Sequence, residues 1–385
     1  MNSLLIIPKR PFPPYEDGDT LIYYYLTKYL QNLHIFYFYH SNSSGEENTF
    51  VDYLKNHHLF KLEIKKDLFS VLFFNFSYYK SFTKQNLKLL VDYIERAKIE
   101  TILCHVSCYK YALYLKKRTE CKIILHAIDC YSMHYLREIS ISTGVKRIRS
   151  FASFLIYSMV EKNYNKFDGI VLVSDFDKKN IIKHGIQKRK IHVINNGVDT
   201  RYFTFPAKRG RNQIFQIGFS GVMNYAPNEN AVLFFLKEIF PEMVTRIPHI
   251  KYYIIGKSPT DAILKMSNQF KSNVVVTGFV QDIRIPLGEL DLYVSTLRSG
   301  SGIKNKILEV LSMGIPVIAS PISLEGMALE SEVIQYSSKS DLIEKIQMLY
   351  VDSDLRKELS QKGRQFVQEK YSWEQKILGY AELLR

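Results

Sequence analysis

The sequence has few of the features that mark membrane, secreted or metal-binding proteins. No apolar run approaches the ~20 residues that a helix needs to span a bilayer. The apolar residues 4–7 are too few for the core of a signal peptide. The four cysteines all lie between Cys104 and Cys130, without the paired spacing of a zinc module. These absences predict a cytoplasmic protein whose cysteines are reduced and structural.

Acidic residues are outnumbered by basic ones. The chain has 52 Lys and Arg against 38 Asp and Glu, a formal net charge of +14. This balance favours an anionic partner, which leaves a nucleotide, a nucleic acid or an acidic membrane open. No helix-turn-helix or aromatic RNA-binding motif supports nucleic-acid binding. Basic clusters gather before residue 212 and predict a surface facing anionic lipid, at residues 116–118, 146–149, 178–183, 188–190 and 208–211.

The apolar pattern indicates two α/β domains. A chain of 385 residues with 46% hydrophobic residues can form two cores of ordinary size. Short strand-like runs alternate with helical patterns, which predicts parallel, doubly wound sheets. The runs lie at residues 4–7, 34–39, 60–64, 101–104, 122–125, 170–173 and 190–194, and then at 214–220, 251–255, 273–277, 291–295 and 315–319.

The segment PAKRGRN, residues 206–212, has the composition of a linker. We therefore predict one Rossmann-like domain over residues 1–205 and a second over residues 213–370. Residues 371–385 form a last helix, in which the single tryptophan, Trp373, is expected to anchor packing.

Residues 291–320 combine a strand, a glycine-serine loop (LRSGSG), a helix and another strand. Such a loop brings backbone N–H groups and a helix N-terminus towards a ligand, which suits a phosphate or diphosphate. Lys304 and Lys306 stand at the helix start, where acidic residues are usual, and an external anion explains them. The alternative is a solvated lysine face with an ion pair between Lys306 and Glu309.

Residues 302–317 read G-I-x-N-K-x-L-E-x-x-x-M-G-x-P-V. This segment resembles the donor-site signature of retaining glycosyltransferases of family 4, in a bacterial sugar-transferase branch. The resemblance implies the GT-B fold, with two Rossmann-like domains facing a cleft and a C-terminal helix that crosses back to the first domain. It also implies transfer of a hexosyl-type sugar from a UDP- or GDP-sugar to an acceptor hydroxyl, with retention of configuration and no metal ion.

The resemblance places the acceptor, a glycan or a lipid-linked molecule, in the synthesis of cell-surface polysaccharide, lipopolysaccharide or glycoconjugates. The enzyme would then lie in the cytoplasm or on the inner face of the membrane. The alternatives are a GT-B epimerase or phosphorylase, a catalytically silent module, and a nucleotide- or nucleic-acid-binding protein.

The resemblance also assigns roles to individual positions. Glu309 would bind the ribose hydroxyls of the donor, and the small-residue loop before it would face the donor's diphosphate and sugar. His105 would lie near the reacting carbon of the donor sugar, with His126 as a weaker candidate. The remaining donor-site positions are Gly18, Gly221, Gly256, Phe279, Val280, Ser299, Gly300, Ser301, Gly302, Ile303 and Lys304.

Two departures from the family pattern concern the same site. Ser301 stands where the first of two glutamates is usual, and Val222 and Pro227 stand where basic residues are expected. We infer that Lys304 and Lys306 supply the missing phosphate charge.

Three other segments have simple structural interpretations. Asp17, Gly18 and Asp19 resemble a metal-binding D-x-D motif, but a helix cap at Asp19 or Thr20 accounts for these aspartates and is the preferred interpretation. In residues 195–199 a glycine is expected at a turn with positive φ and Asp199 in a bond to nearby backbone. The aromatic residues 67–82 would belong to the core or contact a membrane.

Overall fold

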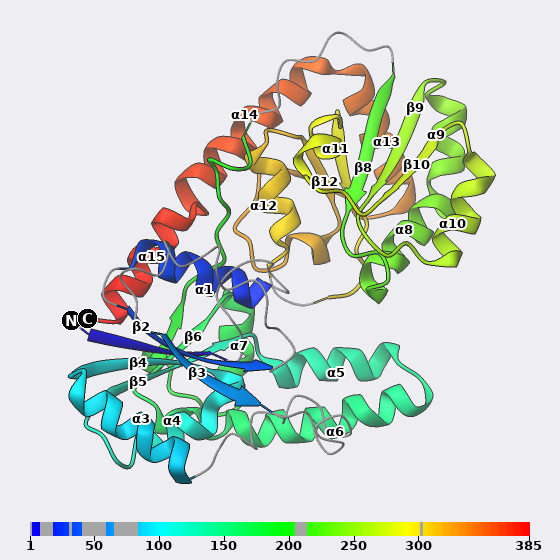
Figure 1. The fold of residues 1–385 in the computed structure, drawn as a ribbon. Helices are drawn as coiled ribbons and strands as arrows, with labels where there is room; N and C mark the ends of the chain where they lie inside the picture. Colours follow the sequence, from blue (N-terminus) through cyan, green and yellow to red (C-terminus); the bar gives the residue numbers. More distant parts are fainter. Residues whose placement is uncertain are drawn as a thin grey trace. The chain divides into compact units, whose positions relative to one another are not determined.

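The computed structural model describes residues 2–7, 18–30, 33–40, 59–64, 84–204, 214–300 and 303–385. It forms two compact units, one made of Met1–Asn195 with Lys376–Arg385 and the other of Asn196–Gln375 (Figure 1). The C-terminal segment therefore belongs to the first unit, as expected of a helix that crosses back. The predicted linker 206–212 and the aromatic residues 67–82 lie outside the described residues. No helix in the described ranges has both the length and the apolar character to cross a membrane.

The first unit contains a parallel sheet in the strand order β3-β2-β1-β4-β5-β6-β7. Its central strands are continuous apolar runs, as in sheets covered by helices on both faces; β5, for example, is buried at every position after its first. Since the order reverses between β1 and β4, a ligand crevice is expected beyond their carboxyl ends. The strands are β1 (Asn2–Ile7), β2 (Leu33–His40), β3 (Leu59–Ile64), β4 (Ile99–His105), β5 (Lys122–Ile128), β6 (Gly169–Leu172) and β7 (Ile191–Val193).

Helices connect these strands. They are α1 (Gly18–Tyr29), α3 (Lys84–Arg96), α4 (Tyr109–Leu115), α5 (Tyr131–Ile141), α6 (Gly144–Glu161) and α7 (Asp175–Lys183). Because α1 already begins at Gly18, Asp19 and Thr20 lie inside the helix, and the capping prediction was wrong. The side chain of Ser174 caps α7 by accepting a hydrogen bond from the backbone N of Asp177.

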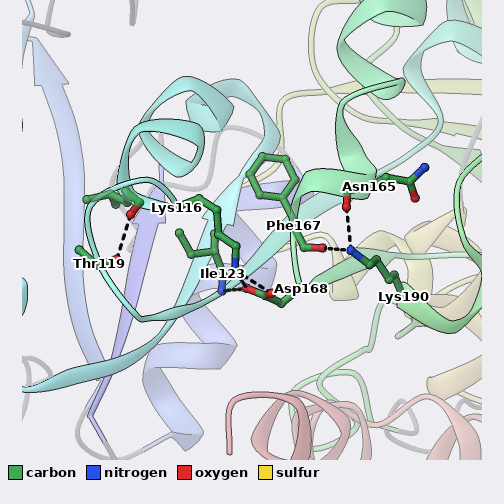
Figure 2. A network of polar contacts seen from close by, with 8 residues as sticks. Lys116, Thr119, Ile123, Asn165, Phe167, Asp168 and Lys190 are labelled. Carbon is green, nitrogen blue, oxygen red and sulfur yellow. Dashed lines mark hydrogen bonds and ion pairs between the residues drawn. The ribbon is translucent and has the colours of Figure 1, made fainter.

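Two predicted basic clusters contribute to the amino-terminal edge of this sheet (Figure 2). The Asp168 carboxylate accepts hydrogen bonds from Lys116 Nζ and from the backbone N of Ile123, each at 2.7 Å. Lys190 Nζ donates to the carbonyl oxygens of Asn165 and Phe167, at 2.7 and 2.8 Å. Both lysines therefore fasten the loops that lead into β5 and β6, at the edge away from the predicted ligand crevice.

The second unit contains a parallel sheet in the order β10-β9-β8-β11-β12-β13. Its order reverses between β8 and β11, which pair directly in the register Leu292 with Ile217. The strands are β8 (Phe215–Ser220), β9 (Ile250–Ile255), β10 (Val274–Gly278), β11 (Leu292–Ser295), β12 (Val317–Ala319) and β13 (Ile334–Gln335); the helices are α8 (Ala226–Glu238), α9 (Phe240–Arg246), α10 (Asp261–Ser267), α11 (Arg284–Gly288), α12 (Asn305–Ser312), α13 (Lys339–Val351) and α14 (Ser353–Lys370). The last helix, α15 (Trp373–Leu383), begins in this unit, but from Lys376 on it belongs to the first unit.

Residues 339–370 form two helices, α13 and α14. The break falls at Asp352, whose side chain accepts hydrogen bonds from the backbone N atoms of Asp354 and Leu355 and so caps α14.

Residues 195–199 pair with the start of α15. The backbone N of Val198 donates to the carbonyl oxygen of Tyr371 at 2.8 Å, and the backbone N of Trp373 donates to the carbonyl oxygen of Val198 at 3.3 Å. Gly197 does not have the expected positive φ. It is required by close approach instead, since a Cβ there would lie 2.7 Å from Cδ2 of buried Trp373. Asp199 Oδ1 accepts bonds from two backbone N atoms further on, as predicted.

Candidate functional site

Most of the predicted donor-site residues of the second unit lie around the switch point between β8 and β11. Helix α8 follows β8 and helix α12 follows β11, so both helices begin at the carboxyl edge of the sheet. Helix α12 has no acidic residue in its first turn, and its N-cap position holds Lys304, a side chain that can only donate. The N-terminal N–H groups of α12 are therefore suited to an anionic ligand.

Lys306 projects from α12 to the first turn of α8. Its Nζ donates to Asn228 Oδ1 at 2.7 Å and lies 4.4 Å from the centre of the Phe219 ring. Asn228 is itself fixed, because its Nδ2 donates to the Val222 oxygen at 2.9 Å. Within residues 214–300 and 303–385, no ion pair joins Lys306 to Glu309. The alternative of an intrahelical ion pair is therefore wrong in this structure.

Burial brings the pKa values of the Lys306 amine and the Glu309 carboxyl together. Loss of solvent lowers the pKa of Lys306 to about 7, an effect that Glu309 opposes and Lys304 strengthens. Loss of solvent also raises the pKa of Glu309 to about 7, against the attraction of Lys306. A bound diphosphate would favour the charged form of Lys306, because opposite charges stabilise one another.

Gly221 and Gly256 bring the loops after β8 and β9 into backbone contact. The backbone N of Gly221 donates to the Ile255 oxygen at 2.9 Å. A Cβ at Gly256 would lie 1.9 Å from the Gly221 oxygen, and a Cβ at Gly221 would lie 2.9 Å from Lys306 Nζ. Neither position has room for a side chain. The bare backbone next to Lys306 lets a phosphate approach closely.

A cluster of buried hydroxyls holds the loop that follows β11. Ser295 and Ser323 share a hydrogen bond of 2.8 Å, and Ser320 Oγ donates to the Leu297 oxygen at 2.6 Å. Thr296 Oγ1 ties the same loop to α8 by donating to the Ala231 oxygen at 2.9 Å. These bonds fix the chain where it enters the predicted phosphate loop.

The phosphate loop itself is described in part. Ser299 is half-buried and Gly300 has φ +124°, a backbone conformation that favours glycine. Ile303 is buried and Lys304 is half-buried. The predicted residues Ser301 and Gly302 lie outside the described residues.

Phe279 and Val280 follow β10 at the same edge of the sheet. The Phe279 ring is 77% exposed, whereas Val280 packs against the core of this unit. An exposed aromatic ring at a strand end offers a face on which a planar ring can stack.

His105 is the last residue of β4, at the switch point of the first unit. The ring is buried, and its Nδ1 accepts a hydrogen bond from the backbone N of Ser107 at 3.0 Å. With Nδ1 as an acceptor, the neutral ring carries its proton on Nε2. Gly18 begins α1, the helix that follows β1 at the same switch point. The predicted site residues thus form two groups, one in each unit.

His126 was predicted to follow a strand, but it lies inside β5. Its ring is hydrogen-bonded to the hydroxyls of Tyr23 in α1 and Tyr380 in α15, at 2.9 and 3.0 Å. Burial, and next the charge of His105, lower its pKa to about 3. His126 is therefore a neutral link between three elements of the first unit. Its predicted position after a strand was wrong, whereas its role as a weaker candidate site residue stays a prediction.

The cysteines and acidic residues form no metal site in the described part of the chain. Cys104, Cys108, Cys121 and Cys130 are all free and buried. Among the described residues, no group of three or more His, Cys, Asp or Glu side chains is placed to hold a metal ion.

Two family models match the sequence. The one described as Glycosyltransferase Family 4 matches residues 22–202, and the one described as Glycosyl transferases group 1 matches residues 214–352. Together the two matches lie on both units. No curated protein is detectably similar in sequence.

Solved glycosyltransferase structures share the fold over the full chain. A glycosyltransferase from Rickettsia africae matches with a TM-score of 0.68 and 15% identity, covering 100% of this chain and 97% of its own. Anabaena HepE in complex with UDP and glucose matches at 0.67 and 12%, covering 100% and 99%. Sucrose-phosphate synthase from Thermosynechococcus elongatus matches at 0.69 and 13%, covering 100% and 98%.

Proposed function

Because the chain belongs to the glycosyltransferases of family 4, with the GT-B fold, we propose that it is a retaining enzyme. It transfers a hexosyl-type sugar from a nucleotide-sugar donor to an acceptor hydroxyl. The observation that carries this proposal is the arrangement at the second switch point, where Lys306, Gly221 and Gly256 surround bare backbone beside the start of α12. That arrangement suits a diphosphate better than a neutral ligand.

The donor diphosphate lies against Gly221, Gly256 and the loop 299–303 in this proposal. Lys306 Nζ donates a hydrogen bond to Asn228 Oδ1, and a phosphate oxygen replaces or supplements that acceptor. Glu309 accepts hydrogen bonds from the ribose hydroxyls, and it must be in its carboxylate form to do so. Phe279 and Val280 border the base, with the exposed ring of Phe279 stacking on it.

Sugar transfer breaks the bond between the anomeric carbon and the phosphate oxygen and forms a bond from that carbon to the acceptor oxygen. Negative charge develops on the departing nucleoside diphosphate, where Lys306, Lys304 and the N-terminus of α12 stabilise it. The departing phosphate oxygen accepts the acceptor's proton, so attack comes from the face that the leaving group vacates. We propose that these cations replace a metal ion, and a chelator should then leave activity unchanged.

His105 contributes from the first unit. Its Nε2 carries the proton in the neutral ring, so it donates a hydrogen bond to a sugar or acceptor oxygen. We place the acceptor, a glycan or lipid-linked molecule of cell-surface glycan synthesis, on this unit and the enzyme on the cytoplasmic face of a membrane. UDP-glucose is the first donor to test and UDP the first nucleotide, because they are the ligands named for Anabaena HepE.

Thermal-shift measurements with a panel of UDP- and GDP-sugars test the proposal. A ligand that binds the folded state raises the stability by RT ln(1 + [L]/Kd), so even weak donors are visible. The Glu309→Ala variant should lose the shift, while Lys265→Gln, an exposed lysine on α10, should keep it. Release of free nucleotide only with an acceptor present would separate a transferase from an epimerase. No shift with any nucleotide sugar would contradict the proposal.

A further inference from the structure

Helix α6 is buried on its polar face and exposed on its apolar face. Its buried residues include Ser150 and Ser153, both less than 5% exposed. Its exposed face carries large apolar side chains: Val145 is 66%, Ile148 70%, Phe151 52%, Leu155 45% and Met159 59% exposed. A helix that served only its own core would show the reverse. The pattern therefore indicates that something outside the described chain covers this face.

The polar face of α6 is occupied by α5, with which it forms a hairpin (Figure 1). Ser150 Oγ donates to Glu138 Oε2 at 2.8 Å. The ring of Tyr157 stacks on Tyr131 and Tyr135, with centroids 4.9 and 5.4 Å apart. Because these contacts fix the rotation of α6, its apolar residues cannot turn inward.

The exposed apolar residues of α6 follow helical spacing. At 100° per residue they form a stripe about 120° wide along the whole helix. Leu136 on α5 is also 45% exposed. We call Val145, Ile148, Phe151, Leu155 and Met159 the apolar stripe.

Cations surround the apolar stripe. Arg147 and Arg149 flank it on opposite sides near the start of the helix, and Lys162 follows its last turn. Lys146, also exposed, is paired with Glu138 at 3.3 Å. The acidic residue of α6, Glu161, is fully buried. No acidic side chain of α6 therefore opposes an anionic surface.

We propose that the apolar stripe of α6 is a membrane-docking surface for anionic lipid bilayers. The helix would lie in the plane of the interface, with the stripe among the acyl chains and the arginines at the phosphates. A second copy of the chain is the poorer occupant, because two like stripes in contact would bring the flanking cations together. The proposal concerns the first unit alone and does not depend on the identity of the donor.

Vesicle flotation with the full chain tests the docking surface. We expect the chain to float with vesicles of phosphatidylcholine and phosphatidylglycerol but not with phosphatidylcholine alone. Ile148→Ser combined with Phe151→Ser should lower the partition coefficient at least about tenfold, since two large side chains no longer insert. The matched control is Leu89→Ser with Leu264→Ser, two exposed apolar residues elsewhere, and it should float as the unchanged chain does.

A second pair of variants tests the charges. Arg147→Gln with Arg149→Gln should lower flotation about tenfold on anionic vesicles. Lys265→Gln with Lys271→Gln removes the same charge from exposed positions of the second unit and should have little effect.

Three results would overturn the proposal. The first is an unchanged chain that stays in the bottom fraction of the gradient at every lipid composition. The second is flotation that the stripe variant and its control reduce equally. The third is a dimer in solution that only the stripe variant converts to a monomer, because a second copy would then occupy the stripe. Flotation is read without donor or acceptor, so its failure and a failure of sugar transfer are distinguishable.

Discussion

The pH dependence of donor binding should have opposite signs in two variants of α12. Lys306 and Glu309 both have pKa values of about 7. If the diphosphate needs Lys306 protonated, the affinity for the donor is highest below that pKa and falls as the pH rises above it. If the ribose needs Glu309 ionised, the affinity for the donor is highest above the same pKa and falls as the pH drops below it. In the unchanged chain the two dependences oppose one another.

The size of each dependence follows from a pKa of about 7. Between about pH 6 and about pH 9 the protonated fraction of such a lysine falls about 90-fold, equivalent to about 2.7 kcal/mol of binding free energy. Over the same range the ionised fraction of the carboxyl rises about 11-fold. The net expectation for the unchanged chain is a fall in affinity of about eightfold.

Titration calorimetry with a nucleotide sugar separates the two groups, because its diphosphate diester does not ionise in this range. Glu309→Gln leaves only the lysine to titrate, so affinity should fall steeply as the pH rises. The fall should begin at a lower pH than in the unchanged chain, because the carboxylate that raises the pKa of Lys306 is gone. Lys306→Arg stays charged, so affinity should rise with pH. Equal slopes in the two variants would refute the assignment of phosphate to Lys306 and of ribose to Glu309.

Three substitutions test packing contacts that support the two sites. Gly256→Ala should abolish nucleotide-induced stabilisation in a thermal shift, because its Cβ would lie 1.9 Å from the Gly221 oxygen; a normal shift would show that the loops can separate. His126→Gln should flatten the pH dependence of the free energy of unfolding. The pKa of His126 is about 3 in the folded state and 6.5 in the unfolded state, so the free energy of unfolding of the unchanged chain falls by up to about 1.4 kcal/mol per pH unit below pH 6.5. Equal slopes for the variant and the unchanged chain in urea titrations would contradict this. Gly197→Ala should cost about 2 kcal/mol in the same assay, because its Cβ would lie 2.7 Å from Trp373, and an unchanged midpoint would argue against close approach.

The sequence predicted the two parallel sheets because short, largely apolar runs alternate with helical patterns. In β5 every residue after the first is buried, so the apolar run and the strand nearly coincide. In β8 every residue is buried, although Gln216 and Ser220 are polar. Strand ends were less certain. His126 was expected beyond a strand, but the alanine and isoleucine after it are also buried and continue β5 to Ile128.

Contacts between distant segments were beyond the sequence. Gly197 was explained by a turn, since its neighbour in space, Trp373, lies 176 positions later and no local pattern connects them. The burial of the polar face of α6, with its apolar face exposed, could not be predicted from the sequence for a similar reason. Its apolar residues recur at helical spacing and cations lie near its start, but spacing alone does not say which face the hairpin with α5 covers.

Asn228 is the clearest residue that sequence reasoning missed at the donor site. Val222 and Pro227 were noted as uncharged positions, and the loss of charge was expected to be offset from α12. The topology explains how α8 still contributes: β8 and β11 are adjacent, so their following helices start side by side although Asn228 and Lys306 are 78 residues apart. An amide there can orient a lysine without competing for the phosphate, because its oxygen only accepts the bond that Lys306 donates. A basic residue at position 228 would instead repel Lys306 and lower its pKa further, so the uncharged Asn228 is compatible with the phosphate-binding role that we propose for Lys306.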